Sequence, residues 1–214
     1  MKNVPEYEAR TLIFDPDDVN NTNIVDAKDG QLVYSIRTKR ERPQDEPFTR
    51  YIDASGRVVG TCQWELVKSD KITIGDSGPM SYNSFMHRGL IPFVDRAYFK
   101  DKLKRKYKWA GHGAGLEFHL YREDDKVNPV ALWKKIARDS EDGTPRASLT
   151  LDNRGMEIQD LVLISFCLME KERRPAAASH WSVAEQYDTL SPGPITGYHP
   201  GETAYRKITP APPQ

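Results

Sequence analysis

Five lysines at every second position form the strongest chemical pattern in this sequence. Side chains two residues apart point to the same face of an extended strand, so this run would line one face with positive charge. Tyr107 and Trp109 would point to the opposite face. A turn at Asp101 and Lys102 would break that register, but it would still gather the charges at one rim of the fold. The predicted anion site consists of Lys100, Lys102, Lys104, Arg105, Lys106 and Lys108.

Phosphoinositide headgroups or anionic phospholipids would suit this patch, because each basic residue near an anionic surface contributes about 1 kcal/mol to binding. The same spacing also suits an edge strand that its lysines guard against aggregation. Nucleic acid is a poorer partner, since Tyr107 and Trp109 would face the core and not the charged side. The chain as a whole exerts no general attraction on anions, because 31 Lys and Arg balance 31 Asp and Glu. A second basic group comprises Arg37, Lys39, Arg40 and Arg42.

Two glycine-rich segments imitate catalytic or nucleotide-binding loops. Residues 75–79, GDSGP, resemble the nucleophile loop of trypsin-like serine proteases. In that family the histidine base precedes the serine in the chain, whereas all five histidines here follow Ser77. Residues 111–115, GHGAG, precede a strand pattern, although a phosphate loop must open a helix. We therefore predict turns at both places and assign no catalytic residue.

Metal binding has little support in the residue spacing. His112 and His119 are seven positions apart, and His119 lies two positions from Glu117. A tight site needs three or four ligands, and no cysteine or aspartate is spaced to complete this set. We predict no metal and no cofactor.

The N-terminus and the cysteines indicate an intracellular protein. The first ten residues, MKNVPEYEAR, lack an apolar stretch, so no signal peptide is predicted. Cys62 and Cys167 are expected to be buried, reduced thiols. We expect a cytoplasmic protein, attached peripherally to a membrane if the anion site binds lipid.

Short β-like runs with turn residues between them occupy most of the chain before residue 152. Residues 116–121 alternate strictly, with Leu116, Phe118 and Leu120 on one face. Residues 130–137 suit a strand or a helix. The other predicted strands cover residues 11–14, 23–26, 31–38, 48–53, 57–67, 72–74, 93–99, 105–110 and 146–151. Regular spacing of short strands predicts a barrel or a sandwich.

One helix is predicted over residues 156–174, and the rest of the chain is organised around it. Leu161 to Met169 are apolar except for Ser165, so every face of this helix is apolar and must be buried. Gly155 gives it a weak N-terminal cap, and Pro175 ends it. The helix is too short to span a bilayer, which takes about 20 apolar residues.

We predict a mainly β fold, a closed antiparallel β-barrel of about ten to twelve strands around this C-terminal helix, which alone is apolar enough to fill the lumen. Residues 1–9 form a flexible N-terminus, and residues 10–174 form the barrel domain with its buried helix. Residues 175–214 form a proline-rich extended tail with seven prolines and scattered aromatic residues. The tail is either flexible or a strap along the barrel, and it is a candidate site for a protein partner.

This order of many short strands and one apolar helix resembles the tubby C-terminal-like superfamily, which includes the LURP-one-related proteins and the phospholipid scramblases. The sequence RKYKW at residues 105–109, Gly111, and LEF at residues 116–118 look like a fungal domain family of unknown function in that superfamily. The resemblance covers residues 10–174 and implies a barrel of about twelve strands around a hydrophobic helix. It carries over no phosphoinositide-binding residue, because the tubby positions cannot be matched one by one.

We therefore expect a non-enzymatic binding module that engages anionic phospholipid or phosphoinositide headgroups through a basic barrel rim. The alternative is a small-molecule enzyme or a protein-interaction scaffold with a pocket at the barrel mouth, where residues such as His112, His119 or Asp76 would act. A deep pocket lined by histidine and acidic groups would favour this alternative, and a flat basic rim would favour the binding module.

Overall fold

The computed structural model describes residues 9–40, 42, 44–65, 69–88, 96–112, 117–136 and 146–171. The chain divides into two units, residues 1–174 and 175–214. The predicted flexible N-terminus lies outside the described residues except for residue 9, and the predicted tail lies wholly outside them. All the described elements belong to the first unit.

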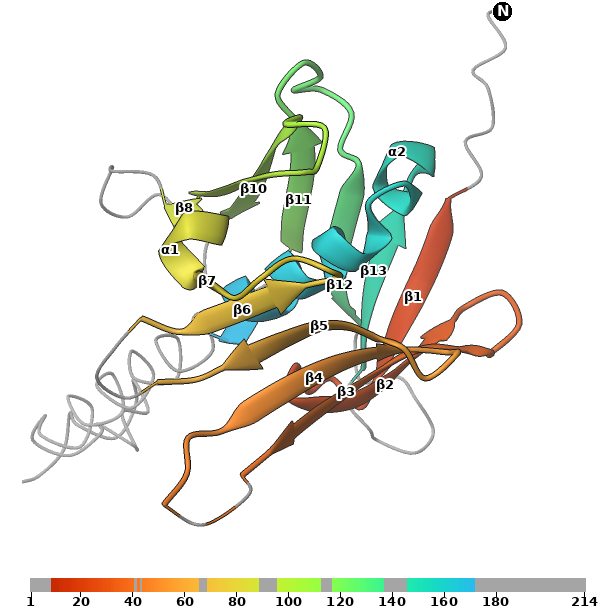
Figure 1. Ribbon diagram of the computed structural model, residues 1–214. Coiled ribbons are helices and arrows are strands. Elements are labelled where there is room, and N and C mark those ends of the chain that lie inside the picture. The colour runs from red at the N-terminus through yellow and green to blue at the C-terminus, as the bar shows by residue number, and fades with distance from the viewer. Residues whose placement is uncertain are drawn as a thin grey trace, which may run out of the picture. The chain divides into compact units, whose positions relative to one another are not determined.

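Within the described residues, thirteen strands form one antiparallel sheet, in which consecutive strands are neighbours except for β7 and β8, and β1 also pairs with β13 (Figure 1). The order across the sheet is β7-β6-β5-β4-β3-β2-β1-β13-β12-β11-β10-β9-β8. The fold is therefore mainly β, as the sequence predicts. The strands are β1 (Arg10–Asp15), β2 (Asn21–Asp26), β3 (Leu32–Lys39), β4 (Phe48–Asp53), β5 (Val58–Gln63), β6 (Lys71–Ile74), β7 (Met80–Ser81), β8 (His87–Arg88), β9 (Arg96–Lys100), β10 (Lys106–His112), β11 (Glu117–Arg122), β12 (Ala131–Ile136) and β13 (Arg146–Leu151).

Turns between consecutive predicted strands form two β-hairpins. Gly30 joins β2 to β3 and Gly56 joins β4 to β5, with φ angles of 71° and 85°. Residues with a side chain rarely adopt this left-handed backbone conformation. Residues 131–136, for which the sequence left strand and helix open, form β12 between β11 and β13.

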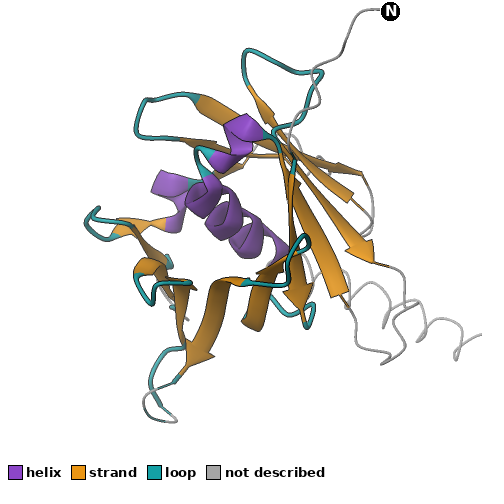
Figure 2. Cartoon of the chain, turned by 90° about the vertical axis from the view of Figure 1, so that its right-hand side faces the viewer, coloured by secondary structure: helices purple, strands orange, loops and turns teal. Residues whose placement is uncertain are grey.

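Hydrogen bonds do not close the sheet into a barrel. Its two edge strands, β7 and β8, have two residues each and are linked by the single-turn helix α1 (Tyr82–Phe85). Ser81 caps α1, since its side chain accepts a hydrogen bond from the Ser84 amide at 3.2 Å. No ladder joins β7 to β8 within the described chain, so the closed barrel is not confirmed. The sheet curves around a helix all the same, with strands on several sides of it (Figure 2).

The predicted helix begins differently from the expectation. A short helix, α2 (Asn153–Met156), starts after Asp152, whose carboxylate caps it by accepting from the Gly155 amide at 2.8 Å. A turn at residues 157–158 follows, and the central helix then covers residues 159–171 of the described chain. A weak cap at Gly155 was the wrong interpretation, because Asp152, a good capping residue, lies three positions earlier.

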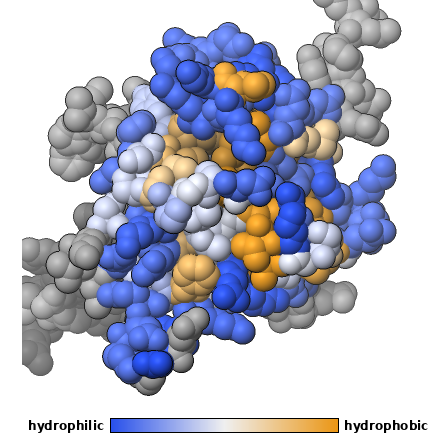
Figure 3. Space-filling view, viewed as in Figure 1, coloured by the Kyte–Doolittle hydropathy of each residue, from blue (hydrophilic) through white to orange (hydrophobic). Residues whose placement is uncertain are grey.

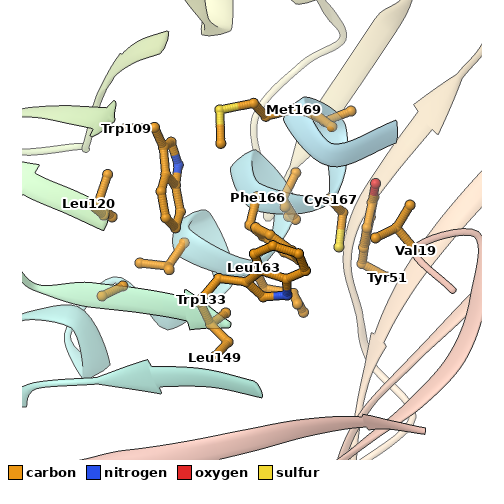
Figure 4. Packing of buried hydrophobic residues seen from close by; sticks show 14 of the residues in the cluster. Val19, Tyr51, Trp109, Leu120, Trp133, Leu149, Leu163, Phe166, Cys167 and Met169 are labelled. Carbon is orange, nitrogen blue, oxygen red and sulfur yellow. The ribbon is translucent and has the colours of Figure 1, made fainter. Parts of the chain in front are cut away.

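Burial of the central helix on all sides is confirmed. Residues 162–170 are all buried. Phe166 packs against Phe14, Trp133 and Trp109, with ring centroids 5.5, 5.3 and 6.1 Å apart. In Figure 4 the side chains of the helix meet Trp109, Trp133 and Leu149 on one side and Tyr51 on another.

Ser165, the one polar residue in the apolar run, has a partner inside this core. The indole N–H of Trp109 donates to Ser165 Oγ at 2.9 Å, and both side chains are fully buried. The hydroxyl in turn donates to the Val162 carbonyl at 3.1 Å. The buried hydroxyl of Ser165 therefore has both a donor and an acceptor as partners, and its burial leaves no polar group of this side chain unpaired.

Cys62 and Cys167 are buried and do not form a disulfide. Burial raises the pKa of the Cys62 thiol to about 12, so this thiol stays protonated at neutral pH. Within the described residues, no helix combines the length and the apolar character that a bilayer crossing requires.

Candidate functional site

A cleft of about 1090 Å³ opens at the end of the sheet where the central helix begins. This volume lies slightly above the range of pockets that hold small ligands, about 300–1,000 Å³. Hydrophobic surface lies among hydrophilic residues on the face drawn in Figure 3. Eight apolar residues from the sheet, α1, the turn between β9 and β10, and the chain from α2 to the start of the central helix line the cleft: Val59, Ile74, Met80, Phe85, Leu103, Met156, Ile158 and Leu161.

A chain of hydrogen bonds forms the polar part of the cleft and ties the helix to the sheet. Tyr34, from β3, donates from its hydroxyl to Asp160 Oδ1 at 2.5 Å. The Gln159 amide donates to the same hydroxyl at 2.8 Å, and Arg10 donates to Gln159 Oε1 at 3.1 Å. Burial first, and then the bond to Asp160, raise the pKa of Tyr34 well above its ordinary value. The phenol therefore stays protonated and keeps its donor role.

The turn between β9 and β10 forms the rim of the cleft next to this network. The Asp101 carboxylate, almost fully buried, accepts from the Arg105 amide at 2.8 Å and from Arg105 Nε at 2.5 Å. Burial alone would raise the pKa of Asp101, but the hydrogen bonds and charge of Arg105 outweigh it, so the pKa is lowered. Lys104 takes a φ of 60° and its amide donates to the Asp101 carbonyl at 2.9 Å, which closes the turn.

The outermost part of this turn is the sequence Lys102-Leu103-Lys104, which we call the hairpin tip. Leu103 is 73% exposed, and both lysines beside it are exposed. No ion pair with Lys102 or Lys104 occurs in the part of the chain that the structure describes. Arg105 differs, because it binds Asp101 at 2.5 Å and Glu157 at 2.9 Å. The positive charge available to a ligand is therefore that of the lysines.

The structure divides the predicted lysine row between two surfaces. A turn follows Lys100, so the row is not one extended strand. Lys100, Lys102 and Arg105 line the cleft, and Lys104 lies at the tip. Lys106 and Lys108 lie on β10 and line a separate hollow on the outer face of the sheet.

Lys106 stands directly opposite Lys100 in the β9–β10 ladder, and like charges at paired positions reduce sheet stability. Glu123, from the turn after β11, binds Lys106 at 3.1 Å. This ion pair offsets part of the repulsion, whereas Lys100, which lines the cleft, makes no ion pair with any residue that the structure describes.

Ser77 and His119 have structural roles, whereas Asp76 lines the cleft and the side chain of His112 lies outside the described part of the chain. The Ser77 hydroxyl donates to the Ile74 carbonyl at 2.7 Å and accepts from the Ile74 amide at 3.1 Å, in a turn between β6 and β7 as predicted. His119 lies between Tyr121 and Glu117 on the outer face of β11, with its ring nitrogens 3.0 and 3.4 Å from their oxygens. No group of three metal-ligating side chains gathers in the described part of the chain. Residues 113–115 of the glycine-rich segment, and Leu116 of the strand predicted after it, lie outside the described residues.

Acidic groups and one histidine do enter the cleft. Asp101 and Glu157 bind Arg105, and Asp160 accepts from Tyr34. His87 lines the same cleft. These carboxylates are occupied by contacts that hold the hairpin, the sheet and the helix together.

Sequence reasoning missed the network around Tyr34 and the partners of the lysines. Tyr34 and Asp160 are 126 positions apart, and no periodicity links them. If the lysine row were one extended strand, Leu103 would lie on the face opposite the lysines. In the sequence, the turn was indicated by Asp101 and Arg105, an acidic and a basic residue four positions apart.

Comparison with known proteins adds the family. An Arabidopsis thaliana protein of known X-ray structure is similar to this chain with a TM-score of 0.42 and 16% identity, over 73% of this chain and 88% of that chain. None of the curated proteins compared with this chain matches it. The profile of the family of unknown function DUF6593 matches residues 17–175. The chain belongs to this family.

Proposed function

We propose that this protein is a non-enzymatic binding module that docks on anionic phospholipid or phosphoinositide surfaces through the hairpin tip. The observation that carries the proposal is Leu103, 73% exposed between Lys102 and Lys104. An exposed leucine costs free energy in water, and it gains about 1.5–3 kcal/mol when its side chain is fully buried. A leucine flanked by lysines therefore matches an interface that is apolar inside and anionic at its surface.

The contributions add up to weak, reversible binding. Lys100, Lys102 and Lys104 would together contribute about 3 kcal/mol near an anionic surface, and insertion of Leu103 about 2 kcal/mol more. A total of about 5 kcal/mol corresponds to a dissociation constant of roughly 0.2 mM. Stable anchoring takes a second membrane-binding signal, so the proposed role is peripheral and depends on lipid composition.

We also infer a variant of the tubby-like barrel in which α1, instead of a hydrogen-bonded ladder, holds β7 and β8 together. The order of thirteen antiparallel strands around a buried helix supports this inference. The proposed location is the cytoplasmic leaflet, where anionic lipids attract basic segments. The two cysteines without a disulfide agree with a reducing compartment.

Co-sedimentation with liposomes tests the proposal. Vesicles of phosphatidylcholine alone are compared with vesicles that also contain phosphatidylserine or a phosphoinositide, at low and high salt. We expect binding to the anionic vesicles only, weakened by salt. Lys102→Ala/Lys104→Ala should reduce it about 30-fold at low salt, since two lysines contribute about 2 kcal/mol. Lys28→Ala/Lys135→Ala removes two other exposed lysines and should leave binding within about twofold.

Leu103→Ser separates insertion from electrostatics. It should weaken binding at both salt concentrations, because apolar burial is not screened. Equal binding to neutral and anionic vesicles would overturn the proposal. So would an equal loss in the control variant with Lys28 and Lys135 replaced.

The cleft favours a second candidate, a pocket for a small amphiphilic molecule. Its apolar lining and the uncompensated Lys100 at its rim suit an anionic ligand with an apolar body. The fluorescent anion 1-anilinonaphthalene-8-sulfonate serves as a probe. Saturable binding that is lost in Met80→Trp, where a larger side chain fills the cleft, would support this candidate. Met80→Trp should leave vesicle binding unchanged, so the two candidates are separable.

A further inference from the structure

A second hollow, of about 380 Å³, lies on the outer face of β9, β10 and β11. We call it the outer hollow and define it by Tyr98, Lys108, Ala110, His119, Tyr121 and Lys126. It shares no lining residue with the cleft beside the hairpin tip. Its volume is within the range of pockets that hold small ligands.

Strand register builds this hollow. Lys108 pairs with Tyr98 of β9 on one side and with Tyr121 of β11 on the other. Residues that stand opposite each other in adjacent strands lie on the same face, with Cβ atoms about 4.5–5.5 Å apart. Tyr107 and Trp109, on either side of Lys108 in β10, are buried in the core. The row formed by Tyr98, Lys108 and Tyr121 therefore faces outward.

The floor of the hollow is low because a small residue follows this row. Ala110 stands opposite His119 in the next outward position of the β10–β11 ladder. The His119 ring lies beside Tyr121, with centroids 6.0 Å apart and Nδ1 3.0 Å from the tyrosine oxygen. This contact holds the Tyr121 ring at one wall. Two aromatic rings thus border a depression over a methyl group.

The charge around the hollow is positive and partly uncompensated. Lys106 binds Glu123 at 3.1 Å and Arg122 binds Asp124 at 2.6 Å. Lys108 and Lys126 make no ion pair with any residue that the structure describes. Two lysines therefore remain available beside the two tyrosines.

Aromatic rings next to uncommitted lysines on a sheet face match the chemistry of a nucleotide. Bases stack on aromatic side chains regardless of sequence, and lysines neutralise the phosphates. We propose that the outer hollow binds nucleotides, with a base against Tyr98 or Tyr121 and its phosphate at Lys108 and Lys126. Tyr107 and Trp109 face the core, as the sequence predicts, and are not available to a nucleic acid. Tyr98 and Tyr121 are available, because strand pairing places them beside Lys108.

Fluorescence anisotropy of short labelled oligonucleotides tests this proposal on the full chain. Oligouridylate, oligothymidylate and a duplex of the same length are compared, with free ATP as a competitor. We expect saturable binding of the single strands and weaker binding of the duplex, whose bases are already stacked. If ATP competes efficiently, the site takes a free nucleotide. If it competes poorly, the site takes one unit of a single-stranded polymer.

Paired variants separate stacking from folding. Tyr98→Ala/Tyr121→Ala should lose at least about tenfold in affinity, whereas Tyr98→Phe/Tyr121→Phe keeps both rings and should stay within about twofold. Ala110→Glu fills the floor with a negative charge and should abolish binding. Lys108→Ala/Lys126→Ala should lower the slope of log affinity against log salt by about 1.4, since each phosphate contact on a single strand contributes about 0.7. Circular dichroism verifies that each variant is folded.

Three outcomes would overturn the proposal. One is the absence of saturable oligonucleotide binding by the wild-type chain. Another is undiminished affinity in folded Tyr98→Ala/Tyr121→Ala protein. The third is the loss of phosphatidylserine vesicle binding in that variant together with displacement of the oligonucleotide by vesicles, which would make the hollow part of a lipid surface.

Discussion

Replacing Ser165 by alanine tests whether the hydrogen bond inside the core is needed for stability. The hydroxyl is the acceptor for the Trp109 indole N–H at 2.9 Å, and both residues are 0% exposed. Without it the N–H has no acceptor in a site closed to water, at a cost of about 1–3 kcal/mol. Alanine returns about 0.5 kcal/mol through its higher helix propensity. The expected net loss in the free energy of unfolding is therefore about 0.5–2.5 kcal/mol.

Urea denaturation followed by far-UV circular dichroism measures this loss, with an unchanged m-value as the sign that the unfolding transition is the same. In thermal unfolding the loss corresponds to a decrease of about 1–10 °C in Tm for a chain of this size. Trp109→Phe provides the second corner of a double-mutant cycle. In the Trp109→Phe background the donor is gone, so Ser165→Ala should be nearly neutral. The reasoning would be refuted if Ser165→Ala cost the same in both backgrounds.

Three further predictions concern stability. Gly155→Ala should lose about 1–3 kcal/mol, because a Cβ there would lie 2.3 Å from the Val130 carbonyl oxygen; Gly78→Ala, where a Cβ meets nothing within 4 Å, is the matched control in the same urea assay. Phe166→Ala should lose about 3–5 kcal/mol in that assay, and a loss below about 1 kcal/mol would contradict the central position of this ring. Hydrogen bonds from neighbouring side chains lower the pKa of Asp53 from 3.8 to about 2. The ionised carboxylate therefore stabilises the fold fully above about pH 4, and this contribution is lost as the pH falls towards 2. Asp53→Asn should show a smaller change in Tm between pH 4 and pH 2 than the wild type, and the same change in both proteins would contradict the lowered pKa of Asp53.

The sequence determined the elements whose cause is local. Leu161 to Met169 is apolar on every face, and such a helix has no stable place except inside the protein. The structure confirms its burial. The alternation around Phe118 and Leu120 likewise predicted β11, with both residues inward. These patterns predict that Phe166 packs against apolar side chains, but they do not identify which side chains these are.

Turn geometry limited the prediction of the candidate site. The lysines recur at every second position both in a straight strand and in a hairpin. Their spacing therefore does not show whether the chain reverses direction within the row. The chain reverses here because the buried carboxylate of Asp101 accepts hydrogen bonds from the amide and the side chain of Arg105. The resulting turn places Leu103 in solvent and divides Lys100 from Lys108.

Only the tertiary structure determined which residues share a surface. Tyr98 and Tyr121 come together beside Lys108 through the register of three strands, and Tyr34 meets Asp160 across 126 positions. A single sequence fixes which face of a strand a side chain occupies, since that depends on alternation alone. It does not fix which strands are neighbours or how they are offset, because these depend on packing energies summed over the whole core.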